Sequence, residues 1–234
     1  MTEALYSHEP YRRECTAQIR EISDRGVVLD RTVFYPLGGG QPGDTGWLQI
    51  DGREPIRVTD TRWLDQALVH VTEEKPDLTP GEQLTARIDW DRRHAHMRMH
   101  TALHLLGSLI PFGVTGGNIS ATKSRLDFDT GEAFDKEKLT AELNALVDAD
   151  HPVQSRWITQ EELAEQPDLV RTMSVKPPAN VPLVRLLEIP GIDLQPCGGT
   201  HVSRTGEIGP VRVSKIENKG KHNRRFNIVF ADPD

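Results

Sequence analysis

Residues 89–111 read DWDRRHAHMRMHTALHLLGSLIP, and the pattern of the chain changes at this stretch. Asp91 is a candidate N-cap, because a short carboxylate accepts hydrogen bonds from the free backbone N–H groups of a first helical turn. Pro111 cannot continue a helical hydrogen-bond ladder. The sequence therefore predicts one long amphipathic helix, whose apolar stripe has spacings of four, three and four residues and is formed by Met99, Leu103, Leu106 and Ile110.

The chain before this helix alternates short apolar runs with turn residues such as those of Asp51-Gly52 and Pro80-Gly81. Several short strands at such a spacing are typical of a small barrel or sandwich. We expect these strands at residues 15–22, 26–30, 33–35, 47–50, 56–58, 67–71 and 84–88.

The chain after the helix mixes strands and helices without a regular alternation, which indicates an α+β fold. A short helix should begin with the capping box of Thr159 and Glu162. The longer helix expected at 135–148 has Leu139, Leu143, Leu146 and Val147 on its inward side, and strands are expected at 125–128, 153–158, 183–188, 210–216 and 226–230. The predicted domains are a β-barrel with a Gly-rich loop at 1–89 and an α+β domain at 90–234.

The composition favours a globular protein of the cytoplasm. No apolar run reaches the roughly 18 residues of a membrane span, and the N-terminus lacks the pattern of a signal peptide. Cys15 and Cys197, the only cysteines, are expected to be free thiols. The formal net charge is −7, which by itself argues against a nucleic-acid partner. Basic residues nevertheless concentrate at 212–225 and at Arg92, Arg93 and Arg98, whereas 127–150 is acidic.

Two pairs of residues predict a metal site. His100 and His104 lie one turn apart on the predicted helix, where two imidazoles can hold one ion. Cys197 and His201 enclose Gly198-Gly199-Thr200, and a thiolate with an imidazole is a pairing typical of zinc. Zinc proteases carry Glu after the first histidine, and Thr101 stands there, so protease chemistry is not indicated.

His96 is a rival ligand on the same helix. His96, His100 and His104 form a series with a step of four residues, and each such step drifts by roughly 40° around the helix. All three imidazoles therefore cannot converge equally well, and spacing alone does not choose between His96 and His104.

The Gly-rich stretch 34–46 reads FYPLGGGQPGDTG. Glycines allow backbone amides to approach a ligand closely, and no Lys-Ser or Lys-Thr follows as in a phosphate-binding P-loop. Gln41 is its one side chain with both a useful donor and a useful acceptor.

Four segments, 34–46, 100–106, 197–202 and 205–209, resemble in order the motifs of the editing domain of alanyl-tRNA synthetase. The chain is similar to the medium-length AlaX family, which pairs a small β-barrel with a zinc-binding editing domain. Leu37 departs from the family, because relatives often carry an acidic residue at that position.

The resemblance implies a trans-editing aminoacyl-tRNA deacylase. Such enzymes hydrolyse the ester that joins a wrong amino acid, serine or glycine, to the 3′ end of tRNA(Ala). Because a synthetic site for alanine rejects serine poorly, a second site must edit. The resemblance leaves the oligomeric state unknown, with a monomer as the simplest expectation.

The resemblance also assigns roles to single residues. His100, His104, Cys197 and His201 would bind Zn²⁺, and Gln41 would act in catalysis. Side-chain sensing would fall to one of Thr115, Asn118, Ser120 and Thr122. The expected substrate-binding residues are Gly39, Gly40, Thr101, Gly198 and Gly199, and the expected tRNA contacts are Arg98, Lys215, Lys219, Lys221, Arg224 and Arg225.

The sequence is compatible with two roles for zinc. Zinc can activate a bound water, but four protein ligands describe a closed structural site. Zinc that positions the substrate together with Gln41 is the favoured mechanism, and Asp193 is a weak candidate for a general base. The alternatives are a zinc-stabilised RNA-binding module without catalysis and a small-molecule zinc hydrolase.

Overall fold

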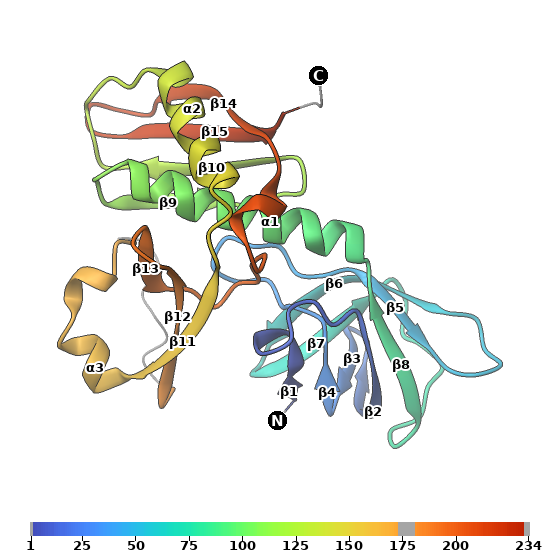
Figure 1. Cartoon of the computed structure of the whole chain (residues 1–234). Helices are drawn as coiled ribbons and strands as arrows, with labels where there is room; N and C mark the ends of the chain where they lie inside the picture. The colour runs from blue at the N-terminus through green and yellow to red at the C-terminus, as the bar shows by residue number, and fades with distance from the viewer. Residues whose placement is uncertain (1, 173–180, 232–234) are drawn as a thin grey trace. The chain divides into compact units, whose positions relative to one another are not determined.

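The computed structural model describes residues 2–172 and 181–231 and contains both helix and sheet. The chain divides into two compact units, Met1–His94 and Ala95–Asp234 (Figure 1). Across the two described ranges, no helix combines the length and the apolar character needed to cross a membrane.

The first unit is built around a closed six-stranded barrel (Figure 1). Side chains alternate between the two faces of β2 (Glu14–Ser23), so Cys15, Ala17 and Ile19 lie in the barrel core. Leu29 and Leu48 are fully buried in the same core. The order around the barrel is β2 (Glu14–Ser23), β3 (Gly26–Leu29), β7 (Ala67–Thr72), β6 (Ile56–Leu64), β5 (Gly46–Gln49) and β8 (Gln83–Ile88).

The strand predicted at 33–35 is wrong. Strand β4 (Arg31–Thr32) lies before it and pairs in parallel with β1 (Glu3–Ala4), which precedes a 3₁₀ turn at Leu5–Ser7. Tyr35 leaves the sheet because its backbone pairs with Asp44: its N–H donates to the Asp44 carboxylate at 2.7 Å, and its carbonyl accepts from the Asp44 N–H at 2.9 Å.

The predicted long helix is confirmed as α1 (Trp90–Leu109). All four residues of its apolar stripe are buried. The N-cap prediction for Asp91 is wrong, because the helix begins at Trp90 and the carboxylate of Asp89 accepts from the Arg92 N–H at 3.3 Å.

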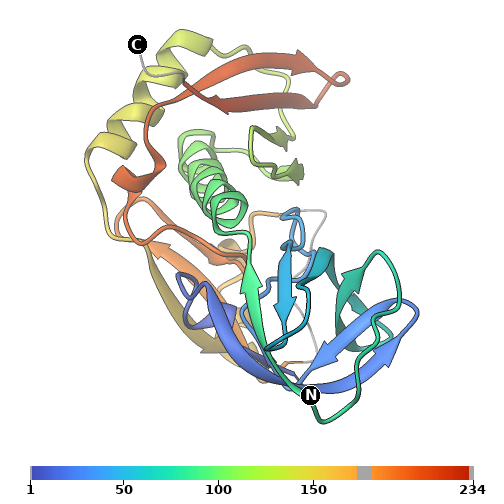
Figure 2. The same ribbon diagram turned by 90° about the vertical axis from the view of Figure 1, so that its right-hand side faces the viewer.

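The second unit contains a four-stranded antiparallel sheet on which α1 packs (Figure 2). Phe128, Phe226 and Ile228 on its strands are fully buried. Helix α2 (Lys136–Asp148), capped by Asp135, packs on the edge strand, where Asn144 exchanges two hydrogen bonds with the Val211 backbone. The strand order is β14 (Val211–Asn218), β15 (Arg224–Phe230), β10 (Lys123–Phe128) and β9 (Val114–Asn118).

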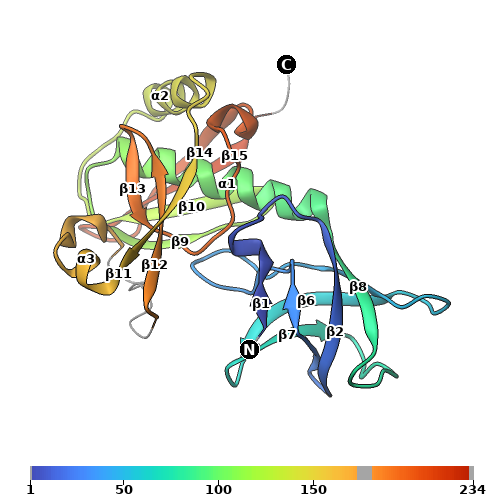
Figure 3. The same cartoon turned by 60° about the horizontal axis from the view of Figure 1, so that its bottom comes forward.

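A smaller three-stranded sheet completes the second unit (Figure 3). The capping box of Thr159 and Glu162 is confirmed at the start of α3 (Gln160–Ala164). The strand order is β11 (Gln154–Thr159), β12 (Leu183–Ile189) and β13 (Asp193–Pro196), and 3₁₀ turns occur at Pro167–Leu169 and Thr205–Ile208. Strand β13 was not predicted, because Asp-Leu-Gln-Pro lacks the alternating apolar pattern of a strand.

Candidate metal centre

The structure brings together the four residues predicted as metal ligands. His100 and His104 lie one turn apart on α1, whereas Cys197 and His201 belong to the segment that follows β13. One nitrogen or sulfur atom of each lies within 4.8 Å of the same atoms of the other three. The segment is held by its backbone, because the Cys197 N–H donates to the Arg185 carbonyl at 3.0 Å.

Two of the distances between donor atoms are close to those around one tetrahedral zinc ion. The Cys197 Sγ lies 3.5 Å from His100 Nε2 and 3.2 Å from His201 Nε2. Zinc–sulfur and zinc–nitrogen bonds of about 2.3 and 2.0 Å place neighbouring tetrahedral ligands about 3.3–3.6 Å apart. The three imidazoles are buried and Cys197 is half-buried, so little of the site is open to water.

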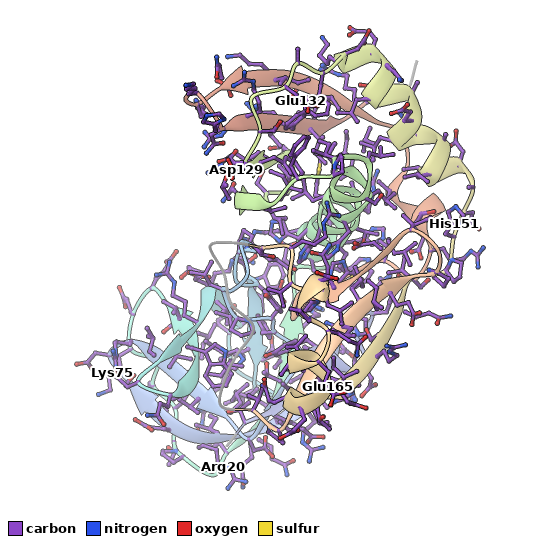
Figure 4. The ribbon with its side chains drawn as sticks, turned by 90° about the vertical axis from the view of Figure 1, so that its left-hand side faces the viewer. Arg20, Lys75, Asp129, Glu132, His151 and Glu165 are labelled. Carbon is purple, nitrogen blue, oxygen red and sulfur yellow. The ribbon has the colours of Figure 1, made fainter. Side chains whose placement is uncertain are left out.

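Hydrogen bonds orient two of the imidazoles toward the cluster. Figure 4 draws the described side chains on the ribbon, with His151 and five other residues labelled. His104 Nδ1 donates to Asp193 Oδ2 at 2.7 Å, which leaves Nε2 for a metal. His201 Nδ1 lies 3.2 Å from the Thr101 hydroxyl, which itself donates to the Met97 carbonyl and therefore accepts from the imidazole. Second partners of this kind fix the ring orientation of metal-binding histidines.

The electrostatics favour the ligand form of the thiol. Burial alone would raise the pKa of Cys197, but the neighbouring His100 and His201 hold it well below its ordinary value. Burial lowers the pKa of His201 well below its ordinary range. Burial would also lower the pKa of His104, yet its hydrogen bond to Asp193 and the adjacent Cys197 raise it to about 10.

The spatial cluster includes His104 and not His96, which favours His104 in the choice that spacing left open. The sequence identifies Asp193 only as a weak candidate for a general base and does not predict its contact with His104. The two residues are 89 positions apart. Asp193 lies on β13 and His104 on α1, and no local sequence pattern predicts a contact between elements so distant in sequence.

The Gly-rich loop lies in the first unit and has a defined shape. Gly39 and Gly40 have φ values of +56° and +82°, which favour glycine. The backbones of Gly38 and Gln41 exchange two hydrogen bonds, of 3.1 and 2.9 Å, and the Gln41 side chain is buried. Leu37, by contrast, is 47% exposed.

The four candidates for sensing the amino-acid side chain differ in environment. Asn118 and Thr122 are exposed. The Ser120 hydroxyl donates to the Lys123 carbonyl at 2.7 Å. Thr115, on β9, has a buried hydroxyl with no hydrogen-bond partner among the described residues.

Comparisons with known proteins relate both units to aminoacyl-tRNA synthetases and the whole chain to alanyl-tRNA editing proteins. The family model described as tRNA synthetases class II (A) matches residues 3–92, and that of the threonyl and alanyl tRNA synthetase second additional domain matches 184–227. A Methanosarcina acetivorans protein named alanyl-tRNA editing protein AlaX-M is 38% identical over 99% of this chain and 100% of its own length. The chain belongs to the AlaX-M family.

Further relatives agree with this assignment. The AlaX-M protein of Saccharolobus solfataricus is 37% identical over 96% of this chain and 97% of its own length. An alanine–tRNA ligase of Pyrococcus furiosus is 33% identical over 92% of this chain, which corresponds to 24% of the ligase. The resemblance predicted from the motifs is thus confirmed at the level of the family.

The basic residues of this AlaX-M family member are engaged to different degrees. Arg225 makes two bonds to the Asp127 carboxylate, at 2.8 and 2.9 Å, and Arg224 donates to the Gly131 carbonyl. Arg98 is half-buried and donates to the Ile208 carbonyl at 2.8 Å. Lys215 and Lys219 both contact Glu217 but remain substantially exposed, as is Lys221.

Proposed function

We propose that this chain is a trans-editing deacylase that hydrolyses seryl-tRNA(Ala), and also glycyl-tRNA(Ala), in the cytoplasm. The observation that carries the proposal is the cluster of three imidazoles and one thiolate, found in a chain that matches proteins named alanyl-tRNA editing protein over their full length. A ligand set with a free thiolate suits a reducing compartment.

His100, His104, Cys197 and His201 would hold Zn²⁺. When bound, zinc supplies a Lewis acid that polarises an ester carbonyl and lowers the pKa of a coordinated water. The protein residues around the cluster supply orientation: Asp193 holds the ring of His104, and Thr101 holds the ring of His201. Gln41 would position the ester or the attacking water through its amide group.

Thr115 is our choice for the residue that senses serine. A buried hydroxyl without a partner is costly, and a substrate hydroxyl of serine would satisfy it. Alanine lacks this hydroxyl and would leave Thr115 unpaired, so the same group that favours serine disfavours alanine. Ser120 is less suitable because its own hydroxyl is already bonded.

The tRNA contacts belong to the three exposed lysines Lys215, Lys219 and Lys221. A long flexible ammonium can leave a surface carboxylate for a phosphate at little cost, because exposed ion pairs contribute only about 0–1 kcal/mol. Arg225 is bound to Asp127 by two hydrogen bonds, so its use by RNA would require breaking that pair.

The direct test is release of serine from seryl-tRNA(Ala) by the purified protein, before and after zinc is removed with a chelator. We expect hydrolysis that is lost on chelation, restored by Zn²⁺ and absent in His100→Ala. Binding of tRNA without hydrolysis would favour the non-catalytic RNA-binding module. Hydrolysis of small esters alone would favour the small-molecule hydrolase.

A further inference from the structure

A buried ion pair lies at the base of the Gly-rich loop. The side chains of Arg93 and Asp44 are 0% and 1% exposed. Arg93 Nε donates to both carboxylate oxygens of Asp44, at 3.0 and 2.9 Å. The two terminal nitrogens of Arg93 also donate to the Val33 carbonyl at 2.7 Å and the Pro10 carbonyl at 3.1 Å. The guanidinium therefore joins two backbone carbonyls and one side-chain carboxylate, which belong to three separate segments of the first unit.

Asp44 closes the loop in which Gln41 lies. Its carboxylate accepts from the Tyr35 N–H, and its own N–H donates to the Tyr35 carbonyl, so both ends of the segment 35–44 meet at this residue. Arg92 adds a bond of 2.7 Å to the Gly43 carbonyl. Two consecutive arginines in the first turn of α1 thus hold one end of the loop.

The rest of the loop is fixed by two hydrogen bonds and by the close approach of Gly43 to the Thr61 backbone. The Tyr35 hydroxyl donates to the Gly38 carbonyl at 2.9 Å, and the Leu37 N–H donates to the Thr61 carbonyl at 2.8 Å. A Cβ atom on Gly43 would lie 2.1 Å from the Thr61 carbonyl oxygen, so this position accepts only glycine. Arg93 and Asp44 thus hold the base of a segment, 35–44, whose other contacts also lie within the first unit.

A buried ion pair is a poor source of stability, because desolvation offsets most of its attraction, and an apolar pair of similar size is often as stable. An apolar pair cannot make directional bonds to the loop and to Val33 and Pro10. We infer that Arg93 and Asp44 are positioning residues, which hold Gln41 in the conformation needed for hydrolysis. The inference rests on the proposed deacylase function.

The test replaces the pair by apolar residues of similar size, Arg93→Met with Asp44→Leu. Two quantities are measured: kcat and KM for seryl-tRNA(Ala), and hydrogen exchange at the amides of Leu37, Gly38, Gln41 and Asp44, which are bonded in the structure. We expect a folded protein with zinc still bound, faster exchange, a kcat lower by about ten- to a hundred-fold and a nearly unchanged KM.

Two comparisons make the result specific. In a Gln41→Ala background the same double replacement should lower kcat by less than about threefold, because residues that act as one unit are not additive. Arg25→Gln with Asp65→Asn removes an exposed pair of the same unit and should change neither quantity.

Unchanged exchange and unchanged kcat in the double variant would overturn the inference, as would a full additional loss in the Gln41→Ala background. The exchange measurement also separates the two claims. If the parent protein hydrolyses no aminoacyl-tRNA, the proposed function fails. If the loop amides of the double variant exchange as slowly as those of the parent protein, the positioning role fails, whatever the activity.

Discussion

At the scale of single residues, the candidate centre depends on pairs that are distant in sequence. Each of two imidazoles uses Nδ1 for a hydrogen bond, to Asp193 or to Thr101, and so directs its other nitrogen into the cluster. The pKa of Cys197 is held well below its ordinary value, which favours the thiolate that a divalent cation would require. Removing a donor atom and removing an orienting atom should therefore have different consequences.

Cys197→Ala removes a donor atom, so we expect loss of bound zinc and a lower Tm together, since metal binding is coupled to folding. Asp193→Asn leaves all four donor atoms and disturbs only the orientation of His104. It should weaken zinc affinity by about 10–100-fold and retain a folded protein at saturating zinc. Zinc titration with a competing chelator measures the stoichiometry and affinity of both variants, and thermal unfolding measures their Tm. Wild-type stoichiometry in Cys197→Ala would contradict the ligand assignment.

Thr115→Val keeps the shape of the side chain and removes its hydroxyl. Because the serine hydroxyl would then lose its partner, kcat/KM for seryl-tRNA(Ala) should fall by about ten- to a hundred-fold. Glycyl-tRNA(Ala), which has no side-chain hydroxyl, should be hydrolysed as before. Ser120→Ala is the matched control and should leave both substrates unaffected. If Ser120→Ala slowed hydrolysis of seryl-tRNA(Ala) and Thr115→Val did not, the sensing role would belong to Ser120.

At the scale of elements, periodicity and turn chemistry predicted most of the fold. The stripe of α1 and the alternation of β2 are regular, and both elements were expected. The errors occur where tertiary contacts replace local preference. Tyr35 pairs with Asp44 rather than with a strand, and the short polar strand β13 exists because it pairs with β12. The Arg93–Asp44 bond was not predicted, since no pattern links residues 49 positions apart.

Asp127 on β10 makes the four-stranded sheet sensitive to acid. Burial would raise its pKa, but hydrogen bonds from Arg225 and Arg125 lower it below the ordinary value. A lowered carboxylate pKa gives stability that is complete above the unfolded pKa of about 4 and is lost as the pH falls through the folded value.

Asp127→Asn mimics the protonated form. At pH 7 it should lower the free energy of unfolding by about 1 kcal/mol. This difference should begin to shrink as the pH falls below about 4 and should disappear below the lowered pKa of Asp127 in the folded protein. Urea unfolding of both proteins across this range is the measurement. A difference that stays constant with pH would show that the charge of Asp127 does not stabilise the sheet.

At the scale of the whole molecule, a net charge of −7 must be reconciled with a polyanionic substrate. Lys215 on β14 and Lys219 and Lys221 in the turn before β15 would supply local positive charge, which would offset long-range repulsion at one surface. The family assignment was accessible from sequence because its motifs are contiguous. The residues that orient the imidazoles, and Thr115 as the proposed sensing residue, could be chosen only from burial and hydrogen bonds.

Replacement of Lys215, Lys219 and Lys221 by Gln should weaken binding of uncharged tRNA(Ala) and lower the steepness of its salt dependence by about one unit for each phosphate that is no longer bound. Glutamines at Lys136 and Lys138 on α2 and at Lys75 in the first unit give the same change in charge and serve as the control. Equal effects of the two triple variants would show that only net charge matters.

The most direct measurement is hydrolysis of seryl-tRNA(Ala) and alanyl-tRNA(Ala) by the wild-type protein and by His100→Ala under single-turnover conditions. A zinc-dependent editing enzyme should release serine rapidly, leave correctly charged alanyl-tRNA(Ala) intact and lose the reaction in the variant. Equal hydrolysis of both substrates, or release of serine that persists in His100→Ala, would contradict the account.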